Sequence, residues 1–262
     1  IAKKYVDLDP LKCSNKKILF IDDRADEGWA KVMKNIFKNS GENFTYVKSA
    51  KYKNKDTNAF FDFEGFYKEC QSHIGEDWDL IIIDLRLNPD NEDLEDENLL
   101  PTDFSGYKLM DEFLNKNEGY QIIVSTASNK IWNVNYALKR GVASYYIKES
   151  PEFNYSLAET NKHYKNFKKE IENCFKKGYL RTIDEIIKNL KNHLDNIDII
   201  EENINFVNFI NSLQAQLNIV KEVAKRIDPD VQSSLDIVYL SLFNVLELFA
   251  EYYLIYKKED YR

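Results

Sequence analysis

Short apolar runs alternate with amphipathic stretches along the first part of the chain. The runs are ILFI at 18–21, FTYV at 44–47, LIII at 80–83, QIIV at 121–124 and ASYYI at 143–147. Between them, residues near 26–39, 60–74, 106–116 and 130–140 have the apolar spacing of helices. Strands that alternate with helices form parallel sheets covered on both faces. The pattern therefore predicts an α/β domain built on a five-stranded, doubly wound parallel sheet.

Acidic residues come directly after two of these runs. Asp22 and Asp23 follow the first run, and Asp84 follows the third. In open parallel sheets, ligands bind beyond the carboxyl ends of strands, where the strand order switches. If the two strands are neighbours, the three carboxylates converge, and two such charges ~4 Å apart repel by about 4 kcal/mol at an effective dielectric constant of about 20. A bound cation would offset that cost, and oxygen ligands favour Mg²⁺.

Two more polar groups stand at the ends of the last two runs. The fourth run continues into Ser125 and Thr126, and the fifth continues into Lys148. For any one of these residues alone, a solvated position at the end of a strand is a simpler interpretation than a functional site. Together, acids, a hydroxyl and an ammonium at one sheet edge favour a site that places a phosphoryl group on a carboxylate, because cations and donors neutralise the phosphoryl oxygens.

The motifs in this order resemble the receiver domain of bacterial two-component response regulators. They are IDD at 21–23, IIIDLRL at 81–87, SGYKLM at 105–110, VSTAS at 124–128 and GVASYYIK at 141–148. The resemblance covers residues 16 to about 175. It implies a flavodoxin-like fold with strand order 2-1-3-4-5 and a sensor histidine kinase or phosphotransfer protein as partner.

The resemblance also implies a role for each site residue. Asp84 is expected to be the phosphoacceptor, and the Mg²⁺ ligands are expected to include Asp22, Asp23, Asp84 and the backbone carbonyl of Arg86. Thr126 and Lys148 are expected to bind the phosphoryl group, and Tyr145 matches the switch aromatic of the family. Tyr146 is adjacent to Tyr145, so a register shift of one residue would exchange their faces.

The sequence departs from the family pattern in two loops. Lys148 is followed by Glu149 rather than by proline, so a cis peptide is not expected there. The segment 88–104 is inserted between Asp84 and Gly106 and contains seven acids and no base. A solvated, mobile loop is the simpler expectation for such a run. The alternative is a lid beside the phosphorylation site that selects the kinase or slows hydrolysis.

The rest of the chain shows only helical periodicity. We expect a receiver domain at 15–176 and an all-helical output or dimerisation domain at 177–262. The apolar rhythm of 179–227 fits one long helix or two helices folded back, and the bundle of two is favoured because a single helix would be long for a compact domain. A dimerising coiled-coil hairpin is the rival. A last helix is expected at about 230–257.

Composition and charge narrow the classes of partner and environment that fit this chain. The net charge of -8 argues against a nucleic-acid surface, which needs concentrated Lys and Arg. No apolar stretch is long enough to predict a membrane span. Three widely spaced cysteines give neither metal-ligand spacing nor a disulfide framework, which favours a reducing, cytoplasmic environment. The first residue is Ile rather than Met, so an N-terminal region can precede this sequence.

The expected function is that of a response regulator phosphorylated on Asp84 with Mg²⁺, without enzymatic activity beyond this step. Helix 4, strand 5 and helix 5 would pass the signal to a helical protein-interaction domain, which is also the place for a homodimer contact. Two alternatives stay open: a degenerate receiver that acts as an unphosphorylated scaffold, and a receiver that regulates a catalytic helical domain. A dehalogenase-type phosphohydrolase is rejected because Arg86 occupies the place of its second acid.

Overall fold

We describe the protein from a computed structural model. The described residues are 11–53, 61–89, 92, 100–127, 131–148, 157–195, 204–228 and 230–259. The chain divides into two compact units, Ile1–Gly178 and Tyr179–Arg262, and each is described by itself.

The first unit is built on a five-stranded, all-parallel sheet. The strand order is β2-β1-β3-β4-β5, as expected for a flavodoxin-like fold. The bounds lie close to the predicted runs: β1 Ile18–Ile21, β2 Phe44–Tyr46, β3 Leu80–Ile83, β4 Ile122–Thr126 and β5 Ser144–Ile147. Because β1 pairs with β3, with Ile21 opposite Ile83, the chain leaves both strands at the same level of the sheet edge.

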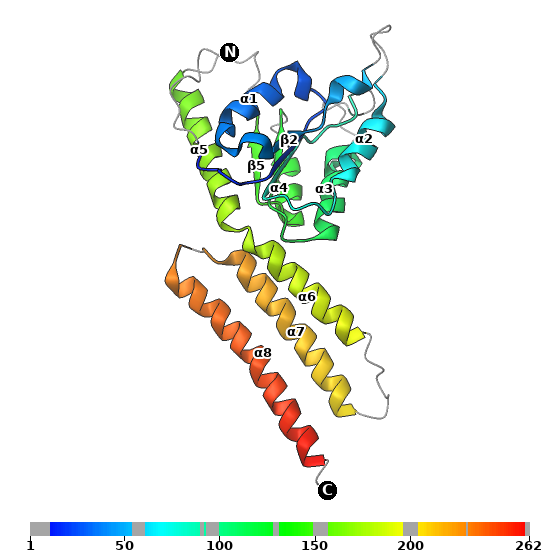
Figure 1. The fold of residues 1–262 in the computed structure, drawn as a ribbon, viewed down its shortest axis with the longest axis vertical. Coiled ribbons are helices and arrows are strands. Elements are labelled where there is room, and N and C mark those ends of the chain that lie inside the picture. The colour runs from blue at the N-terminus through cyan, green and yellow to red at the C-terminus, as the bar shows by residue number, and fades with distance from the viewer. Residues whose placement is uncertain are drawn as a thin grey trace. The chain divides into compact units, whose positions relative to one another are not determined.

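Helices cover both faces of this sheet (Figure 1). Their bounds are α1 Trp29–Ile36, α2 Phe63–Ser72, α3 Ser105–Lys116, α4 Ile131–Arg140 and α5 Leu157–Lys176, with short 3-10 segments η2 Ala25–Glu27, η3 Lys38–Asn43, η4 Ser49–Tyr52 and η5 Pro101–Asp103. Alternate strand residues enter two separate cores, since successive side chains of a strand point to opposite faces. Leu19 and Ile21 join residues of α2, α3 and α4, whereas Ile18 and Phe20 join residues of α1 and α5.

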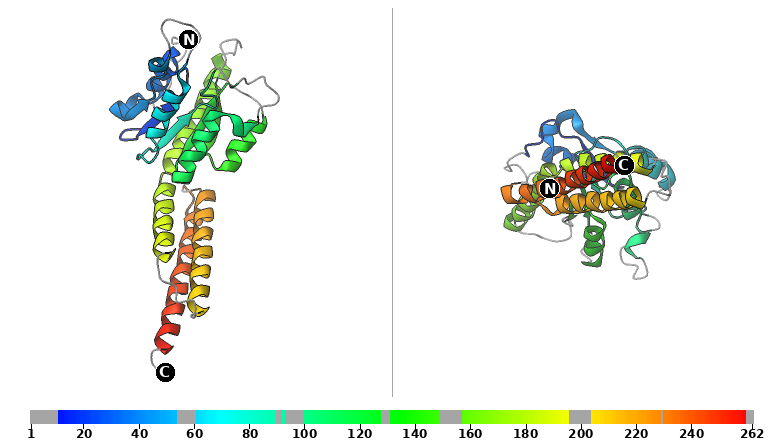
Figure 2. Two further views of the ribbon diagram at one scale, coloured as in Figure 1. Left: turned by 90° about the vertical axis from the view of Figure 1, so that its right-hand side faces the viewer. Right: turned by 90° about the horizontal axis from the view of Figure 1, so that it is seen from below.

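The second unit contains α6 Tyr179–Asp195, α7 Ile204–Arg226 and α8 Gln232–Glu259 (Figure 2). Residues 179–227 therefore contain two helices, as favoured from the sequence, with 196–203 outside the described residues. The core of the unit contains Leu213 and Leu217 of α7, Ile187 of α6 and Val245 of α8. Within the described part of the chain, no helix is both long enough and apolar enough to cross a membrane.

Candidate phosphoacceptor and metal site

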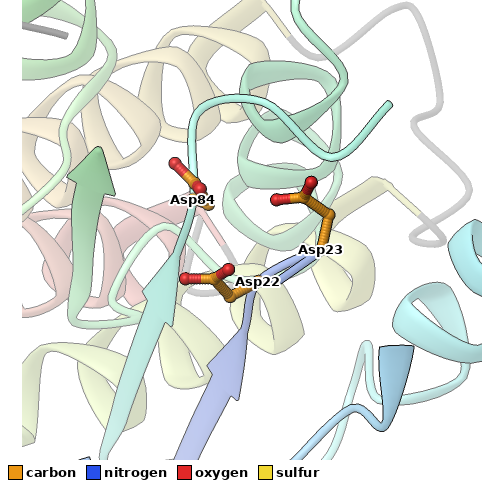
Figure 3. A group of neighbouring side chains, drawn as sticks. All are labelled: Asp22, Asp23 and Asp84. Carbon is orange, nitrogen blue, oxygen red and sulfur yellow. The ribbon is translucent and has the colours of Figure 1, made fainter. Parts of the chain in front are cut away.

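Three carboxylates meet at the carboxyl ends of β1 and β3. Asp22 and Asp23 follow β1, Asp84 follows β3, and one oxygen of each lies within 4.8 Å of the others (Figure 3). The backbone amide of Asp84 donates to the carbonyl of Ile21 at 2.9 Å, which ties the two strand ends together. The side chains of Asp22 and Asp23 are buried. The convergence predicted from strand pairing is present.

Lys148 brings a buried ammonium group to the same carboxylates. Its Nζ donates to Asp22 Oδ2 and to Asp84 Oδ2, at 2.7 Å in each case. The residue is 6% exposed and lies directly after β5, where its backbone amide donates to the carbonyl of Thr126 at 2.7 Å. The sheet therefore delivers the positive charge and the acids to one point from separate strands.

Burial and mutual repulsion perturb the ionisation of this cluster. Burial raises the pKa of Asp23 to about 7, with further contributions from the charges of Asp84 and Asp22. Burial also raises the pKa of Asp84, against the opposing effect of Lys148. Burial alone would lower the pKa of Lys148, but the charges of Asp84 and Asp22 outweigh it and raise that pKa. The site therefore contains more negative charge than its lysine compensates.

The donor set fits a hard divalent cation. Asp22, Asp23 and Asp84 supply carboxylate oxygens, which Mg²⁺ and Ca²⁺ prefer. The cation nearest to Asp23 among the described ion pairs is the half-exposed Arg24, with Nε 3.9 Å from Oδ2. Such a contact compensates little charge. The role expected for the Arg86 carbonyl stays a prediction, and the Arg86 side chain donates from Nη1 to the carbonyl of Glu92 at 3.2 Å.

Thr126 and Tyr145 lie at the same end of the sheet. Thr126 closes β4 and is 1% exposed. Tyr145 is half-buried in β5, opposite Val124 of β4, and packs against the core shared by α2, α3 and α4. Its hydroxyl is hydrogen-bonded to that of the buried Tyr107 of α3. Thr126 thus ends β4 with a buried side chain, and Tyr145 places a half-buried ring on the face of β5 toward α3 and α4.

Tyr146 occupies the opposite face of β5. Its ring stacks on Phe167 of α5 with a centroid distance of 3.9 Å and on His163 at 5.0 Å. The register therefore assigns the face toward α3 and α4 to Tyr145, which resolves the ambiguity of the adjacent tyrosines. His163 of α5 is engaged in this aromatic stack.

Sequence comparisons find no match. No protein-family model matches the chain. No curated protein matches it either.

Comparison with solved structures finds response regulators. A receiver domain protein from Methanospirillum hungatei is 18% identical, with a TM-score of 0.36, and the match covers 61% of this chain and 98% of that one. A response regulator from Burkholderia pseudomallei, described with a phosphorylated aspartic acid, calcium ion and citrate, is 19% identical with a TM-score of 0.35, over 60% and 71% of the two chains. The response regulator TrrA from Thermotoga maritima, described in complex with Mg²⁺-BeF, is 18% identical with a TM-score of 0.33, over 58% and 97%.

The first unit has a flavodoxin-like fold, with a parallel sheet of strand order 2-1-3-4-5. Strand order and parallel pairing establish the fold in this chain itself. At these identities and TM-scores no role is carried over from the matched structures, and the function is argued from the side-chain geometry of the first unit.

Gly106 permits a close backbone approach behind the site. Its amide donates to the carbonyl of Leu85 at 3.0 Å. A Cβ atom at this position would lie 2.0 Å from the carbonyl oxygen of Asp84 and 2.5 Å from that of Leu85. Because both obstacles are backbone atoms, they can give way only if the segment that carries Asp84 moves. The glycine of the SGYKLM motif is therefore a steric requirement of the first unit.

Glu92 corrects the expectation of a uniformly solvated insert. It is 6% exposed, and its carboxylate accepts from the Ser105 amide at 2.8 Å and from the Ser105 hydroxyl at 2.9 Å. Ser105 Oγ also accepts from the amide of Leu87 at 3.0 Å. Most other acids of the insert lie outside the described residues. The prediction is wrong for Glu92, which anchors the insert to the start of α3; acidity alone gave no signal of this, since a charge run is normally solvated.

Trp29 was not recognised from the sequence as part of the site. The Lys148 Nζ lies 5.2 Å from the centroid of its ring, within the range of a cation–π contact. Trp29 begins α1, seven positions after Asp22, and no spacing rule links it to Lys148. The contact places an aromatic ring beside the ammonium that pairs with Asp84.

Proposed function

We propose that the protein is a two-component response regulator and that Asp84 is its phosphoacceptor. The observation that carries this proposal is the pairing of Asp84 with the buried ammonium of Lys148 at 2.7 Å, inside a cluster of three carboxylates. A carboxylate held by a fixed cation at a sheet edge is positioned for nucleophilic attack, and the same cation stabilises charge that gathers on a transferred phosphoryl group.

The proposed step transfers a phosphoryl group from a phosphohistidine of a sensor kinase or phosphotransfer protein. An oxygen of Asp84 attacks phosphorus in line, the new P–O bond forms, and the P–N bond breaks. The electron pair of that bond remains on the histidine nitrogen, which takes up a proton. Lys148 then pairs with a phosphoryl oxygen, and the Thr126 hydroxyl donates to another.

Asp22, Asp23 and Asp84, with the carbonyl of Arg86, are the groups proposed to hold Mg²⁺. The ion would supply positive charge that balances the carboxylates and the transferred phosphoryl group. The charge excess of the cluster supports this part of the proposal, since Asp23 is buried and only Arg24 approaches it at 3.9 Å among the described ion pairs.

Signalling would follow from repacking at β4 and β5. When Thr126 turns toward the phosphoryl group, the space beside it becomes available to Tyr145, whose hydroxyl is hydrogen-bonded to that of Tyr107. The resulting change in α4, β5 and α5 would reach a helical output unit that acts through protein contacts. Two-state changes of this kind need only a local change in charge and packing.

Phosphorylation can be tested by intact-mass spectrometry with Mg²⁺ and a small phosphodonor. The proposal expects wild type to gain one phosphoryl mass and Asp84→Asn to gain none. The same incubation with a chelator in place of Mg²⁺ should also give no gain. A wild-type protein that binds Mg²⁺ but never gains the mass would refute the phosphoacceptor role and favour the scaffold alternative.

A receiver that regulates a catalytic helical unit is the second candidate from the sequence. Among the described residues of the helical unit, buried Asp184 pairs with Lys221 at 2.8 Å and with Lys188 at 2.9 Å. The Lys221 contact joins α6 to α7, the Lys188 contact lies within α6, and both are structural in kind. We therefore favour protein contacts as the output of the helical unit.

A further inference from the structure

Helix α8 exposes large apolar side chains on the side away from α7. Its inner side contacts α7 through the buried Val245 and through aromatic packing on Phe209, which lies 4.3 Å from the ring of Tyr252 and 5.4 Å from that of Phe249. The outer side includes Tyr239, Leu240, Leu242, Phe243, Leu246 and Leu254, exposed by 66%, 65%, 42%, 55%, 64% and 62%. An amphipathic surface helix would carry polar side chains there.

The outer residues form a narrow stripe with the spacing of a coiled coil. Tyr239, Phe243, Leu246 and the exposed Ala250 follow one another at intervals of four, three and four. The three intervals span 11 residues, and an 11-residue repeat also keeps one seam of a helix against a partner helix. We call these four residues, with Leu254, the α8 stripe. Its regular spacing indicates a helical partner.

We propose that the α8 stripe is a docking surface for a second copy of this chain. The six outer side chains present on the order of 700 Å² of apolar surface, close to the ~800 Å² that each partner buries in a stable interface. Contiguous apolar patches of this size mark interaction sites on folded proteins. The outer side of α8, which includes the stripe, is thus comparable in area to one partner's share of a stable interface.

Charge favours a second copy over a partner of complementary charge. Ile237–Leu246 contains no charged residue, and the nearest acids are Asp236 and Glu247 at its two ends. This uncharged segment meets its own copy without like-charge repulsion, whereas a charged partner would leave its charges unpaired there. The repeat spacing also matches when the partner is the same helix, as a two-fold interface requires.

Sedimentation equilibrium of the full chain tests this inference. Wild type should have twice the mass of the chain and dissociate on dilution. Leu246→Glu should weaken the dimer by at least about 30-fold, the loss that removal of a central interface residue causes. Tyr239→Lys is a second disrupting variant, and the high exposure of both residues makes their replacement compatible with folding, which circular dichroism checks.

Ile237→Glu is the matched control on the same helix. Ile237 is 51% exposed but lies about 160° around α8 from Tyr239, so the variant should remain dimeric. A monomeric wild type, or a dimer that withstands both Leu246→Glu and Tyr239→Lys, would overturn the inference. A monomer would mean that another part of the chain or a different protein covers the stripe.

The inference is independent of phosphoryl transfer. Asp84→Asn and wild type without a phosphodonor should dimerise equally. Loss of phosphorylation with an intact dimer would therefore count only against the proposed function, and a phosphorylated monomer only against the α8 interface.

Discussion

Lys148 donates from Nζ to Asp84 Oδ2 at 2.7 Å, although 64 positions separate the two residues in the sequence. Both groups are largely removed from water, with side-chain exposures of 5% and 13%. A buried ion pair loses much more when one partner is removed than an exposed pair does, because the remaining charge is left without compensation. This pair therefore bears on stability as well as on phosphoryl transfer.

Replacement of Lys148 by Met should destabilise the metal-free protein by about 3–5 kcal/mol. The carboxylates of Asp22 and Asp84 would lose their shared donor, and added Mg²⁺ should restore part of the loss. Urea unfolding with and without Mg²⁺ measures both effects. Phosphorylation should slow on the order of 100-fold, the usual effect of removing one charge-stabilising group.

Lys16→Met is the control for this variant. Lys16 pairs with Asp79 at 2.9 Å, but the side chains are 34% and 23% exposed. Solvent screening limits such a pair to about 0–1 kcal/mol. Equal losses for the two lysine variants would contradict the buried character of the Lys148 contacts.

Mg²⁺ affinity should fall as the pH falls below about 7. The pKa of Asp23 is raised to about 7 by burial and by Asp84 and Asp22. In the metal-free protein, the stability associated with protonated Asp23 is present below the unfolded pKa near 4 and is lost as pH rises through 7. At high pH, where Asp23 is ionised, a bound cation offsets the cost of its buried charge. At low pH the cation must displace a proton from Asp23, so binding should weaken roughly tenfold from pH 8 to pH 6.

Isothermal titration calorimetry at the two pH values measures this dependence. Asp23→Asn should bind Mg²⁺ weakly at both, with a flatter dependence on pH. If the wild-type protein bound Mg²⁺ with the same affinity at pH 8 and pH 6, Asp23 would not be the group that loses a proton when the ion binds.

Glu92→Ala should cost about 2–3 kcal/mol of folding stability, because the buried amide and hydroxyl of Ser105 would lose their acceptors. The segment from Asp84 to α3 would also be less well held, so phosphorylation should slow. Thermal unfolding and the phosphoryl mass assay measure the two effects. Glu42→Ala removes an exposed acid and should change neither; similar behaviour of both variants would mean that Glu92 is not an anchor.

Gly106→Ala should lower stability by about 1–3 kcal/mol or more and suppress phosphorylation, because the new methyl group would overlap the carbonyl oxygens of Asp84 and Leu85. Gly178→Ala is the matched control, since its Cβ would lie 3.5 Å from its nearest neighbour. Denaturant unfolding distinguishes the two. A stable, readily phosphorylated Gly106→Ala protein would show that the Asp84 segment can shift without functional cost.

The sequence by itself determined the parallel sheet of the first unit and the residues that meet at its edge. Unbroken apolar runs required strands buried on both faces, and their alternation with helical patterns required a parallel sheet. Acids at strand ends could then be placed at one edge, because parallel strands present their carboxyl ends together. Asp22, Asp23, Asp84 and Lys148 were identified on this basis and lie together in the structure.

Only the tertiary structure decided how neighbouring residues divide between faces and between burial and solvent. Tyr145 and Tyr146 differ by one position, and strand register alone assigned them to opposite cores. Glu92 lies in an acidic run, and only its position beside Ser105 explains its burial. In the sequence, the α8 stripe and the inner side of the helix are equally apolar. Packing against α7 covers the inner side and leaves the stripe exposed. These properties depend on contacts between distant segments, which local pattern does not encode.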